Sequence, residues 1–295
     1  MSNTSLELLN AHACFGGAQR VYQHASREIG LPMKFSVYLP PQALHGAHGT
    51  STPKVPALVY LAGLTCNEET FMTKAGAQRL AAELGLALVA PDTSPRGAGV
   101  PGESEAWDFG VGAGFYLDAT EAPWEAHWRM ESYLTRELLP LLGQKLPIDL
   151  ERIGLFGHSM GGHGALTLAL RHPGMFKSLS AFAPIAAPTQ CPWGQKAFSG
   201  YLGSGDKAEW RKHDASVLMA SQSEAPYPGG ILIDQGLADK FLLDGQLLPE
   251  AFEAACAKVG QPLTLRRQPG YDHGYYFIQT FMADHLAHHA QALAG

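Results

Sequence analysis

A pentapeptide of the form glycine-any-serine-any-glycine places the strongest constraint on how this chain can fold. It reads Gly157-His158-Ser159-Met160-Gly161 and lies between an apolar run, Ile153–Phe156, and a run with helical periodicity, Gly161–Arg171. A side chain at the tip of such a strand-to-helix turn has a strained backbone, so its neighbours must be small, as the two glycines are. The pattern predicts that Ser159 stands at a tight turn beside the free N–H groups of a helix.

Beyond about residue 55, short apolar runs alternate with longer helical patterns. This alternation favours a mainly parallel sheet with helices on both faces. The sequence predicts eight strands, of which the first two could pair antiparallel: Arg20–His24, Met33–Leu39, Ala57–Leu61, Ala87–Ala90, Ile153–Phe156, Ser178–Phe182, Ile231–Ile233 and Leu263–Arg266. It predicts helices over Glu69–Leu84, Trp124–Leu142, Gly161–Arg171, Gln246–Val259 and Tyr276–Leu293.

The composition favours one globular domain over residues 1–295, because no repeat and no Gly/Ser/Pro-rich linker divides the chain. A net charge of −6 without a basic run argues against nucleic-acid binding.

The uncharged stretches Ile153–Leu170 and Ser178–Gln195 are interrupted by glycines or prolines, which indicates buried strands and turns and not membrane spans. Four scattered cysteines and an N-terminus without a secretory pattern favour a cytoplasmic protein with reduced thiols.

A serine nucleophile needs a base, and a histidine turn late in the chain is the candidate. Where a serine lies on a strand-to-helix turn of this kind, the histidine follows the last strand. His273 follows Leu263–Arg266 in the turn Pro269-Gly270-Tyr271-Asp272-His273-Gly274. We therefore predict that His273 is the base.

The acid that orients this histidine should follow a strand that precedes the last strand in the chain. Asp239 lies just past Ile231–Ile233 and is favoured by position. Asp234, at the edge of the same strand, is the competitor, although it could instead bind backbone N–H groups of the following turn. Asp272 is expected to point elsewhere and Asp244 to cap a helix start, so the residues alone leave Asp239 and Asp234 open.

Two backbone N–H groups should stabilise a developing oxyanion. One belongs to Met160, the residue after the serine, and the other to a residue of Ala62-Gly63-Leu64-Thr65. Leu64 is chosen because it directly follows Gly63.

Several histidines and aromatic residues are given structural interpretations. His285, His288 and His289 have helical spacings that could hold a metal, but no carboxylate or cysteine pattern completes a site, so a solvated helix face is preferred. We expect His158 and His163 to form local hydrogen bonds, and Trp107 and Phe115 to be core aromatics.

Two further segments carry expectations about pocket and loop. Trp193 lies in the sequence Cys-Pro-Trp-Gly, which predicts a turn and not a helix. The sequence favours equally a core position for Trp193 and a position lining the acyl or thiol pocket. The glycine-rich and aromatic segment Asp92–Thr120 is too long for a plain connector and should be functional or disordered.

Motifs distributed over nearly the whole chain resemble the esterase D family of α/β-hydrolases. The matching stretches are Leu61-Ala62-Gly63-Leu64-Thr65-Cys66-Asn67-Glu68, Trp107-Asp108-Phe109-Gly110, Gly114-Phe115-Tyr116-Leu117-Asp118-Ala119-Thr120, Gly157-His158-Ser159-Met160-Gly161-Gly162-His163-Gly164-Ala165, Cys191-Pro192-Trp193-Gly194, Ile233-Asp234-Gln235-Gly236, Phe241-Leu242-Leu243-Asp244-Gly245-Gln246 and Tyr271-Asp272-His273-Gly274-Tyr275-Tyr276-Phe277.

The resemblance implies an α/β-hydrolase fold and a serine thioesterase that hydrolyses S-formylglutathione to glutathione and formate, with a formyl-serine intermediate. It implies Ser159 as nucleophile, His273 as base and Asp239 as acid, which selects Asp239 over Asp234. Leu64 and Met160 would supply the oxyanion N–H groups. A small-molecule thioester substrate and a homodimer are implied, and neither a cofactor nor a metal is expected.

Two segments of this chain depart from the family pattern, and one cysteine lies near the predicted site. Leu237 and Ala238 depart from the family's usual Asp-Gln-Gly-Lys-Asp-Asp, and the loop Pro41–Pro53 is longer than expected, which affects surface contacts. The resemblance places Cys66 beside the active site, as a vulnerable neighbour of the chemistry.

The serine motif leaves room for other functions, because it does not encode the acyl donor. A general carboxylesterase or acyltransferase on the same fold is the main alternative. A catalytically silent binding protein is a third, against which the complete set of serine, aspartate and histidine argues.

Overall fold

The described part of the chain, residues 5–44, 53–205 and 207–294 of a computed structural model, is built around a nine-stranded sheet. Its strand order is β1-β2-β3-β5-β4-β6-β7-β8-β9, antiparallel from β1 to β5 and parallel from β5 to β9. The strands are β1 (Leu6–Cys14), β2 (Gly17–Ala25), β3 (Pro32–Leu39), β4 (Val55–Leu61), β5 (Ala87–Pro91), β6 (Ile148–His158), β7 (Ser178–Phe182), β8 (Ile231–Gly236) and β9 (Leu263–Gln268).

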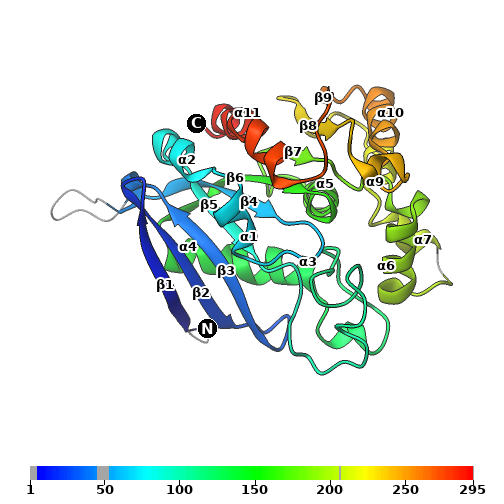
Figure 1. Ribbon diagram of the computed structural model, residues 1–295, viewed down its shortest axis with the longest axis horizontal. Coiled ribbons are helices and arrows are strands. Elements are labelled where there is room, and N and C mark those ends of the chain that lie inside the picture. Colours follow the sequence, from blue (N-terminus) through cyan, green and yellow to red (C-terminus); the bar gives the residue numbers. More distant parts are fainter. Residues whose placement is uncertain (1–4, 45–52, 206, 295) are drawn as a thin grey trace.

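The central strands are buried because helices cover both faces of the sheet. Every residue of β5 and β7 is buried, which fits continuous apolar runs. Helices α2 (Gln78–Leu84) and α11 (Tyr275–Leu293) lie on one side of the sheet, and α4 (Leu139–Lys145) and α5 (Met160–Arg171) lie on the other (Figure 1). The expected α/β-hydrolase architecture is therefore confirmed.

Seven further α-helices lie in the described residues, together with three 3₁₀ turns, Pro41–Ala43, Trp124–Ala126 and Pro188–Gln190. The α-helices are α1 (Thr70–Lys74), α3 (Met130–Ser132), α6 (Pro192–Leu202), α7 (Lys207–Arg211), α8 (Ala215–Ala220), α9 (Lys240–Leu243) and α10 (Pro249–Val259), and a π-helical turn, Tyr133–Leu138, joins α3 to α4. None of the helices in the described residues is long and apolar enough to cross a membrane.

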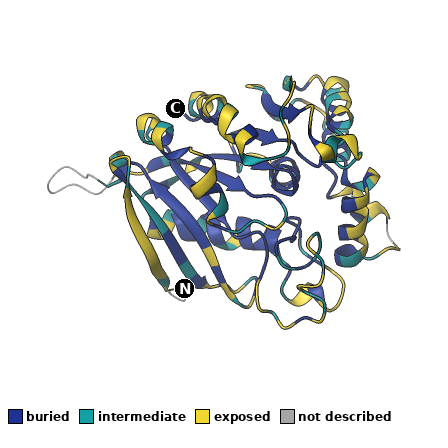
Figure 2. Ribbon diagram, in the orientation of Figure 1, coloured by how far each residue is buried: buried dark blue, intermediate teal, exposed yellow. Residues whose placement is uncertain are grey.

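The expected count of eight strands was one too low. The antiparallel pairing of the first two expected strands is confirmed as β2 with β3, but β1 precedes them. This strand lies at the edge of the sheet and is largely exposed (Figure 2), so it lacks the buried apolar run that revealed the central strands.

Two expected helices are interrupted. The segment Glu69–Leu84 breaks into α1 and α2 around Gly76, whose φ of 66° lies in the left-handed region. The segment Trp124–Leu142 contains a 3₁₀ turn, α3, the π-helical turn and the start of α4.

The turn expected around Trp193 is in fact the start of helix α6. Pro192 occupies its first turn, where a proline is favoured because its missing N–H is not needed. Trp193 is therefore a helical residue, 7% exposed. Asp244, expected at a helix start, instead ends α9.

The solvated face expected for His285, His288 and His289 is also wrong. His285 and His289 are fully buried and face the sheet, where His289 bonds to the hydroxyls of Ser178 and Ser180. His288 is half-buried, and its Nε2 bonds to the backbone carbonyl of Leu179.

The long segment Asp92–Thr120 is described throughout and is not disordered. Phe115 is fully buried and packs near His163, whose Nε2 bonds to the Phe115 carbonyl. The segment packs against the carboxyl edge of the sheet and supports the loop after β4. Within the loop Pro41–Pro53, residues 45–52 lie outside the described part of the chain.

Candidate active site

Ser159 occupies a strained turn between β6 and α5. Its φ and ψ are 58° and −119°, a conformation that L-residues rarely adopt and that is typical of a nucleophile elbow. A Cβ on Gly157 would lie 2.2 Å from the Gly161 carbonyl oxygen, and a Cβ on Gly161 would lie 1.9 Å from the Leu61 carbonyl oxygen. Both glycines are therefore required by the close approach of α5 to the end of β4, as the sequence predicted.

Asp239 and His273 meet in a hydrogen bond near the ends of neighbouring strands. Asp239 follows β8 and His273 follows β9, so both lie at the carboxyl edge of the sheet, as Ser159 does after β6. The His273 Nδ1 lies 2.6 Å from the Asp239 Oδ2. The other oxygen, Oδ1, accepts the N–H groups of Phe241 and Leu242 and so caps α9. Asp239 is fully buried and held from two sides, which fixes the orientation of the imidazole.

Gly63 lies close to both Ser159 and His158, and the His158 ring lies against the His273 ring. A Cβ on Gly63 would lie 3.2 Å from both the Ser159 Cβ and the His158 Nδ1, and the His158 and His273 rings are 4.3 Å apart. In the described residues no hydrogen bond joins the Ser159 hydroxyl to His273. Such contacts commonly tighten only when substrate binds.

His158 is a neutral neighbour of His273. Its ring is buried, and among the described residues neither ring nitrogen has a hydrogen-bond partner, contrary to the local hydrogen bond expected. Burial, together with the nearby His273 ring, lowers the pKa of His158 well below its usual value. It therefore adds no positive charge beside His273. His163 does form the expected local bond, and burial lowers its pKa to about 3.

The two expected oxyanion donors lie on either side of the serine turn. Met160 is the first residue of α5, so its N–H has no partner within the helix. Leu64 lies in the tight turn in which the Cys66 N–H donates to the Gly63 carbonyl. Among the described residues, neither the Leu64 nor the Met160 N–H donates to another protein group, so both are available to a ligand.

The segment Asp92–Thr120 holds this turn in place. The Thr65 N–H donates to the Gly112 carbonyl, and the Tyr116 hydroxyl donates to the Ala62 carbonyl. The long segment therefore supports the loop of Leu64 on both sides.

The competing aspartates have other partners. Asp234 is fully buried and bonds to Arg266, Gln268 and His285. Burial raises the pKa of Asp234, but the bonds from His285, Arg266 and Gln268 outweigh it and hold the pKa below its usual value. Asp272 accepts the Gly274 N–H, and among the described residues it forms no hydrogen bond with His273. Asp234 thus binds side chains and not the backbone N–H groups suggested by its position.

A row of aromatic rings leads away from His273. The rings of His273 and Phe241 are 4.9 Å apart, those of Phe241 and Trp193 are 4.6 Å apart, and Trp193 meets the exposed Trp107 at 5.6 Å. Trp193 therefore lies two rings from His273, whereas Trp107, expected in the core, is 55% exposed. Phe241 was not singled out from the sequence, although its place two residues after Asp239 was a usable signal.

Cys66 lies directly beyond the Leu64 turn and is half-buried. Its carbonyl accepts bonds from Thr93 and Arg96. Burial raises the pKa of the Cys66 thiol, although the nearby Tyr275 and Thr70 hydroxyls and the Lys74 ammonium act in the opposite direction.

The chain is similar to known proteins over nearly its whole length. Residues 26–288 match the protein family described as "Putative esterase". The chain is 53% identical to the S-formylglutathione hydrolase of Mus musculus, over 98% of this chain and 99% of the mouse protein. It is 54% identical to that of Paracoccus denitrificans, over 97% and 98%. A solved structure of an S-formylglutathione hydrolase from Agrobacterium tumefaciens superposes with a TM-score of 0.91 at 49% identity, covering 97% of this chain and 99% of that chain.

Proposed function

The chain belongs to the esterase family, and from that premise we propose that it hydrolyses the thioester S-formylglutathione to glutathione and formate. The observation that carries this assignment is identity above 50%, over nearly the full length of both chains, to relatives named S-formylglutathione hydrolases. The geometry around Ser159 supports a serine esterase mechanism.

In the first half of the proposed reaction, the Ser159 hydroxyl attacks the formyl carbon of the thioester. His273 accepts the serine proton on Nε2, because its Nδ1 is engaged by Asp239. The buried Asp239 carboxylate stabilises the resulting imidazolium. The negative charge on the former carbonyl oxygen is stabilised by the N–H groups of Leu64 and Met160.

Collapse of this tetrahedral intermediate breaks the carbon–sulfur bond. The glutathione sulfur leaves with the proton held by His273, and a formyl group remains on Ser159. A thiol is far more acidic than an amine, so its departure needs little proton donation. Water then gives a proton to His273 and attacks the formyl carbon, which releases formate and restores the serine hydroxyl.

We further propose a single domain over residues 1–295 that works as a homodimer in the cytoplasm. One continuous sheet joins elements from β1 to β9, which supports a single domain. Cys14, Cys66, Cys191 and Cys256 are all free thiols, which supports a reducing compartment. The dimer is supported by the family resemblance, and light scattering of the purified protein tests it.

Steady-state kinetics on three substrates tests the proposed function. We expect kcat/KM for S-formylglutathione to exceed that for S-acetylglutathione and for an aryl acetate by at least about tenfold each, because added acyl bulk must fit beside the Leu64 turn. A preference for the aryl acetate, or equal values for all three, would identify a general carboxylesterase.

A further inference from the structure

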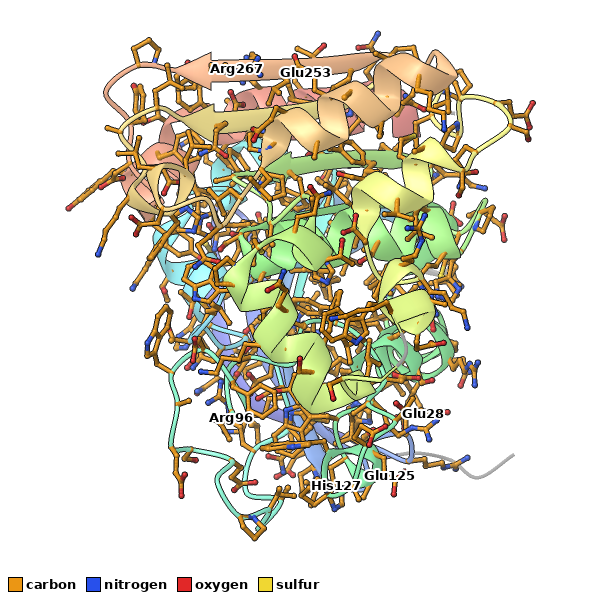
Figure 3. The ribbon with its side chains drawn as sticks, turned by 90° about the vertical axis from the view of Figure 1, so that its right-hand side faces the viewer. Glu28, Arg96, Glu125, His127, Glu253 and Arg267 are labelled. Carbon is orange, nitrogen blue, oxygen red and sulfur yellow. The ribbon has the colours of Figure 1, made fainter. Side chains whose placement is uncertain are left out.

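A cavity of about 370 Å³ lies beside the carboxyl end of β5, at the same edge of the sheet as Ser159. Residues of β2, β3 and the segments that follow Cys66 and β5 line it. Its volume lies within the range of small-molecule sites, and the carboxyl edge of a parallel sheet is where α/β proteins bind ligands. Arg96 is one of the lining residues and is labelled in the lower part of Figure 3. That view looks at the side of the molecule toward which strand β4 points in Figure 1.

The charges that line this cavity are only partly paired with one another. Arg96 binds both carboxylate oxygens of Asp92, at 2.7 and 2.8 Å, so these two charges compensate each other. Glu68 and Lys34 remain. Among the described residues, neither side chain forms a hydrogen bond to another side chain or an ion pair within 4 Å, although the nearby Lys34 charge and the Glu68 backbone N–H both act to lower the pKa of Glu68.

Glu68 is the unusual member of the pair, because it is only 5% exposed. A buried carboxylate without an ion-pair partner is costly. Burial and the nearby charge of Asp92 raise the pKa of Glu68, and they outweigh the opposite effect of the Lys34 charge. A cationic ligand group in the cavity would supply the missing partner. Lys34, which is exposed at the rim, offers the opposite charge to a carboxylate.

The cavity lies within reach of Ser159. The strand order β3-β5-β4-β6 places two strand spacings, roughly 10 Å, between the end of β5 and the serine turn after β6. Lys34 lies on β3, one spacing further out at roughly 14 Å, so its long side chain has to cover the difference. Glu68 follows Leu64 by four residues, and the Arg96 guanidinium bonds to the Cys66 carbonyl between them. An extended residue spans roughly 3.5 Å, and the γ-linkage of glutathione adds two methylenes, so its glutamyl end lies roughly 8–10 Å from the sulfur.

We propose that this cavity binds the α-amino acid end of the γ-glutamyl group of the thiol leaving group, with the Glu68 carboxylate on its ammonium and the Lys34 ammonium on its carboxylate. This inference rests on the proposed function, since it assumes a glutathione thioester. A zwitterion matches a cavity that carries one unpaired charge of each sign, whereas the glycyl end of glutathione carries only a carboxylate. Glu68 and Lys34 would therefore determine specificity for the thiol and not for the acyl group.

Kinetics on two thioesters tests the proposal. The first is S-formylglutathione, and the second is S-formyl-N-acetylcysteinylglycine, which lacks the γ-glutamyl group and whose acetyl cap prevents migration of the formyl group to nitrogen. For the wild-type protein we expect kcat/KM to be at least about tenfold higher for S-formylglutathione, which is the scale of one charged hydrogen bond. Glu68→Gln and Lys34→Ala should each reduce this ratio about tenfold, mainly through KM for S-formylglutathione.

Glu253→Gln is the matched control. Glu253 forms an exposed ion pair with Arg267 at the top of the view in Figure 3, far from Arg96, and should leave the ratio at its wild-type value. Lys34→Ala changes an exposed side chain, so it keeps the test decisive if Glu68→Gln fails to fold.

The outcomes separate this inference from the proposed function. The cavity does not bind the glutamyl group if the wild-type protein hydrolyses S-formylglutathione and the truncated thioester with equal kcat/KM. The same conclusion follows if Lys34→Ala and a folded Glu68→Gln keep the wild-type ratio of the two kcat/KM values. If the wild-type protein does not hydrolyse S-formylglutathione, the proposed function is wrong and the inference fails with it.

Discussion

At the scale of single residues, two buried aspartates on β8 and just beyond it have different partners. Asp239 bonds to His273 and caps α9, whereas Asp234 bonds to Arg266, Gln268 and His285. From the sequence, either aspartate could be the acid, because the position of a residue in the chain does not reveal which carboxylate contacts the histidine. The contacts indicate a positioning role for Asp239 and a structural role for Asp234.

The two aspartates should therefore respond differently to the same substitution. Asp239→Asn should lower kcat by about 10³- to 10⁴-fold, because an amide favours the wrong tautomer of His273. Asp234→Asn should lower the free energy of unfolding by about 2 kcal/mol while kcat changes less than tenfold, since Arg266 and His285 lose a charged partner. Kinetics and urea unfolding of both variants measure this. The reverse pattern would show that the acid is Asp234.

Alkylation of Cys66 should inactivate the enzyme, because added bulk would displace the Leu64 N–H, and one oxyanion donor is worth about 10²–10³ in kcat. The thiolate is the reactive form, and burial raises the pKa of this thiol above its ordinary value, so inactivation by iodoacetamide should still be accelerating at the upper end of an alkaline pH series. The rate of activity loss between pH 7 and 10 measures this.

Cys66→Ser should keep most of the activity and resist the reagent. Burial raises the pKa of Cys191 to about 11 and that of Cys256 to about 12, so these thiols should react more slowly. Unchanged inactivation of Cys66→Ser would place the sensitive thiol elsewhere. An inactive but folded Cys66→Ser would make the thiol a participant in the chemistry.

At the scale of elements, the turn from β6 into α5 depends on the contact between α5 and β4. Gly161→Ala should lower the free energy of unfolding by about 3 kcal/mol, because the added Cβ would lie 1.9 Å from the Leu61 carbonyl oxygen and backbone would have to move. Gly229→Ala is the control, since no atom lies within 4 Å of its Cβ, and should change stability by less than about 0.5 kcal/mol. Equal urea midpoints for the two variants would contradict this account of the turn.

The elements also show where sequence patterns lose information. The strand before Ser159 and helix α5 could be predicted because Ile153–Phe156 and nearly all of α5 are buried and mostly apolar. Helix α6 was missed because Cys-Pro-Trp-Gly contains two residues typical of turns, although a proline also begins helices. The edge strand β1 was missed because most of its residues face solvent, where burial does not select a run of large apolar side chains.

At the scale of the whole molecule, buried polar side chains join α11 to the sheet. His289 bonds to Ser178 and Ser180, and His285 bonds to Ser180 and to Asp234. Sequence alone suggested that these histidines were solvated, because a histidine on a helix does not reveal whether a serine lies opposite. The same limit applies to the site: the chain order of Ser159, Asp239 and His273 was predictable, but Phe241 and the neutral His158 depend on three-dimensional packing.

The buried histidines should make stability depend on pH. Burial lowers the pKa of His285, and lowers that of His289 well below its usual value, so the unfolded chain binds more protons below its histidine pKa of about 6.5. Stability is therefore full above this pH and is lost as the pH falls through it. The melting temperature should drop by several degrees between pH 7.5 and 5.5.

His289→Asn should melt lower than the wild-type protein at pH 7.5 but show a shallower dependence on pH, because one buried titrating group is gone. His12→Asn, on the exposed strand β1, should keep the wild-type slope. Identical slopes for the wild-type protein and His289→Asn would contradict the role assigned to this ring.

The kcat of Ser159→Ala on S-formylglutathione tests the central claim most directly, because every step of the proposed mechanism passes through the serine oxygen. The account predicts a loss of at least about 10⁴-fold, with the melting temperature within a few degrees of the wild-type value, since the histidine, the aspartate and the backbone donors cannot replace the nucleophile. Retention of a tenth of the wild-type kcat would contradict the account and place the nucleophile elsewhere.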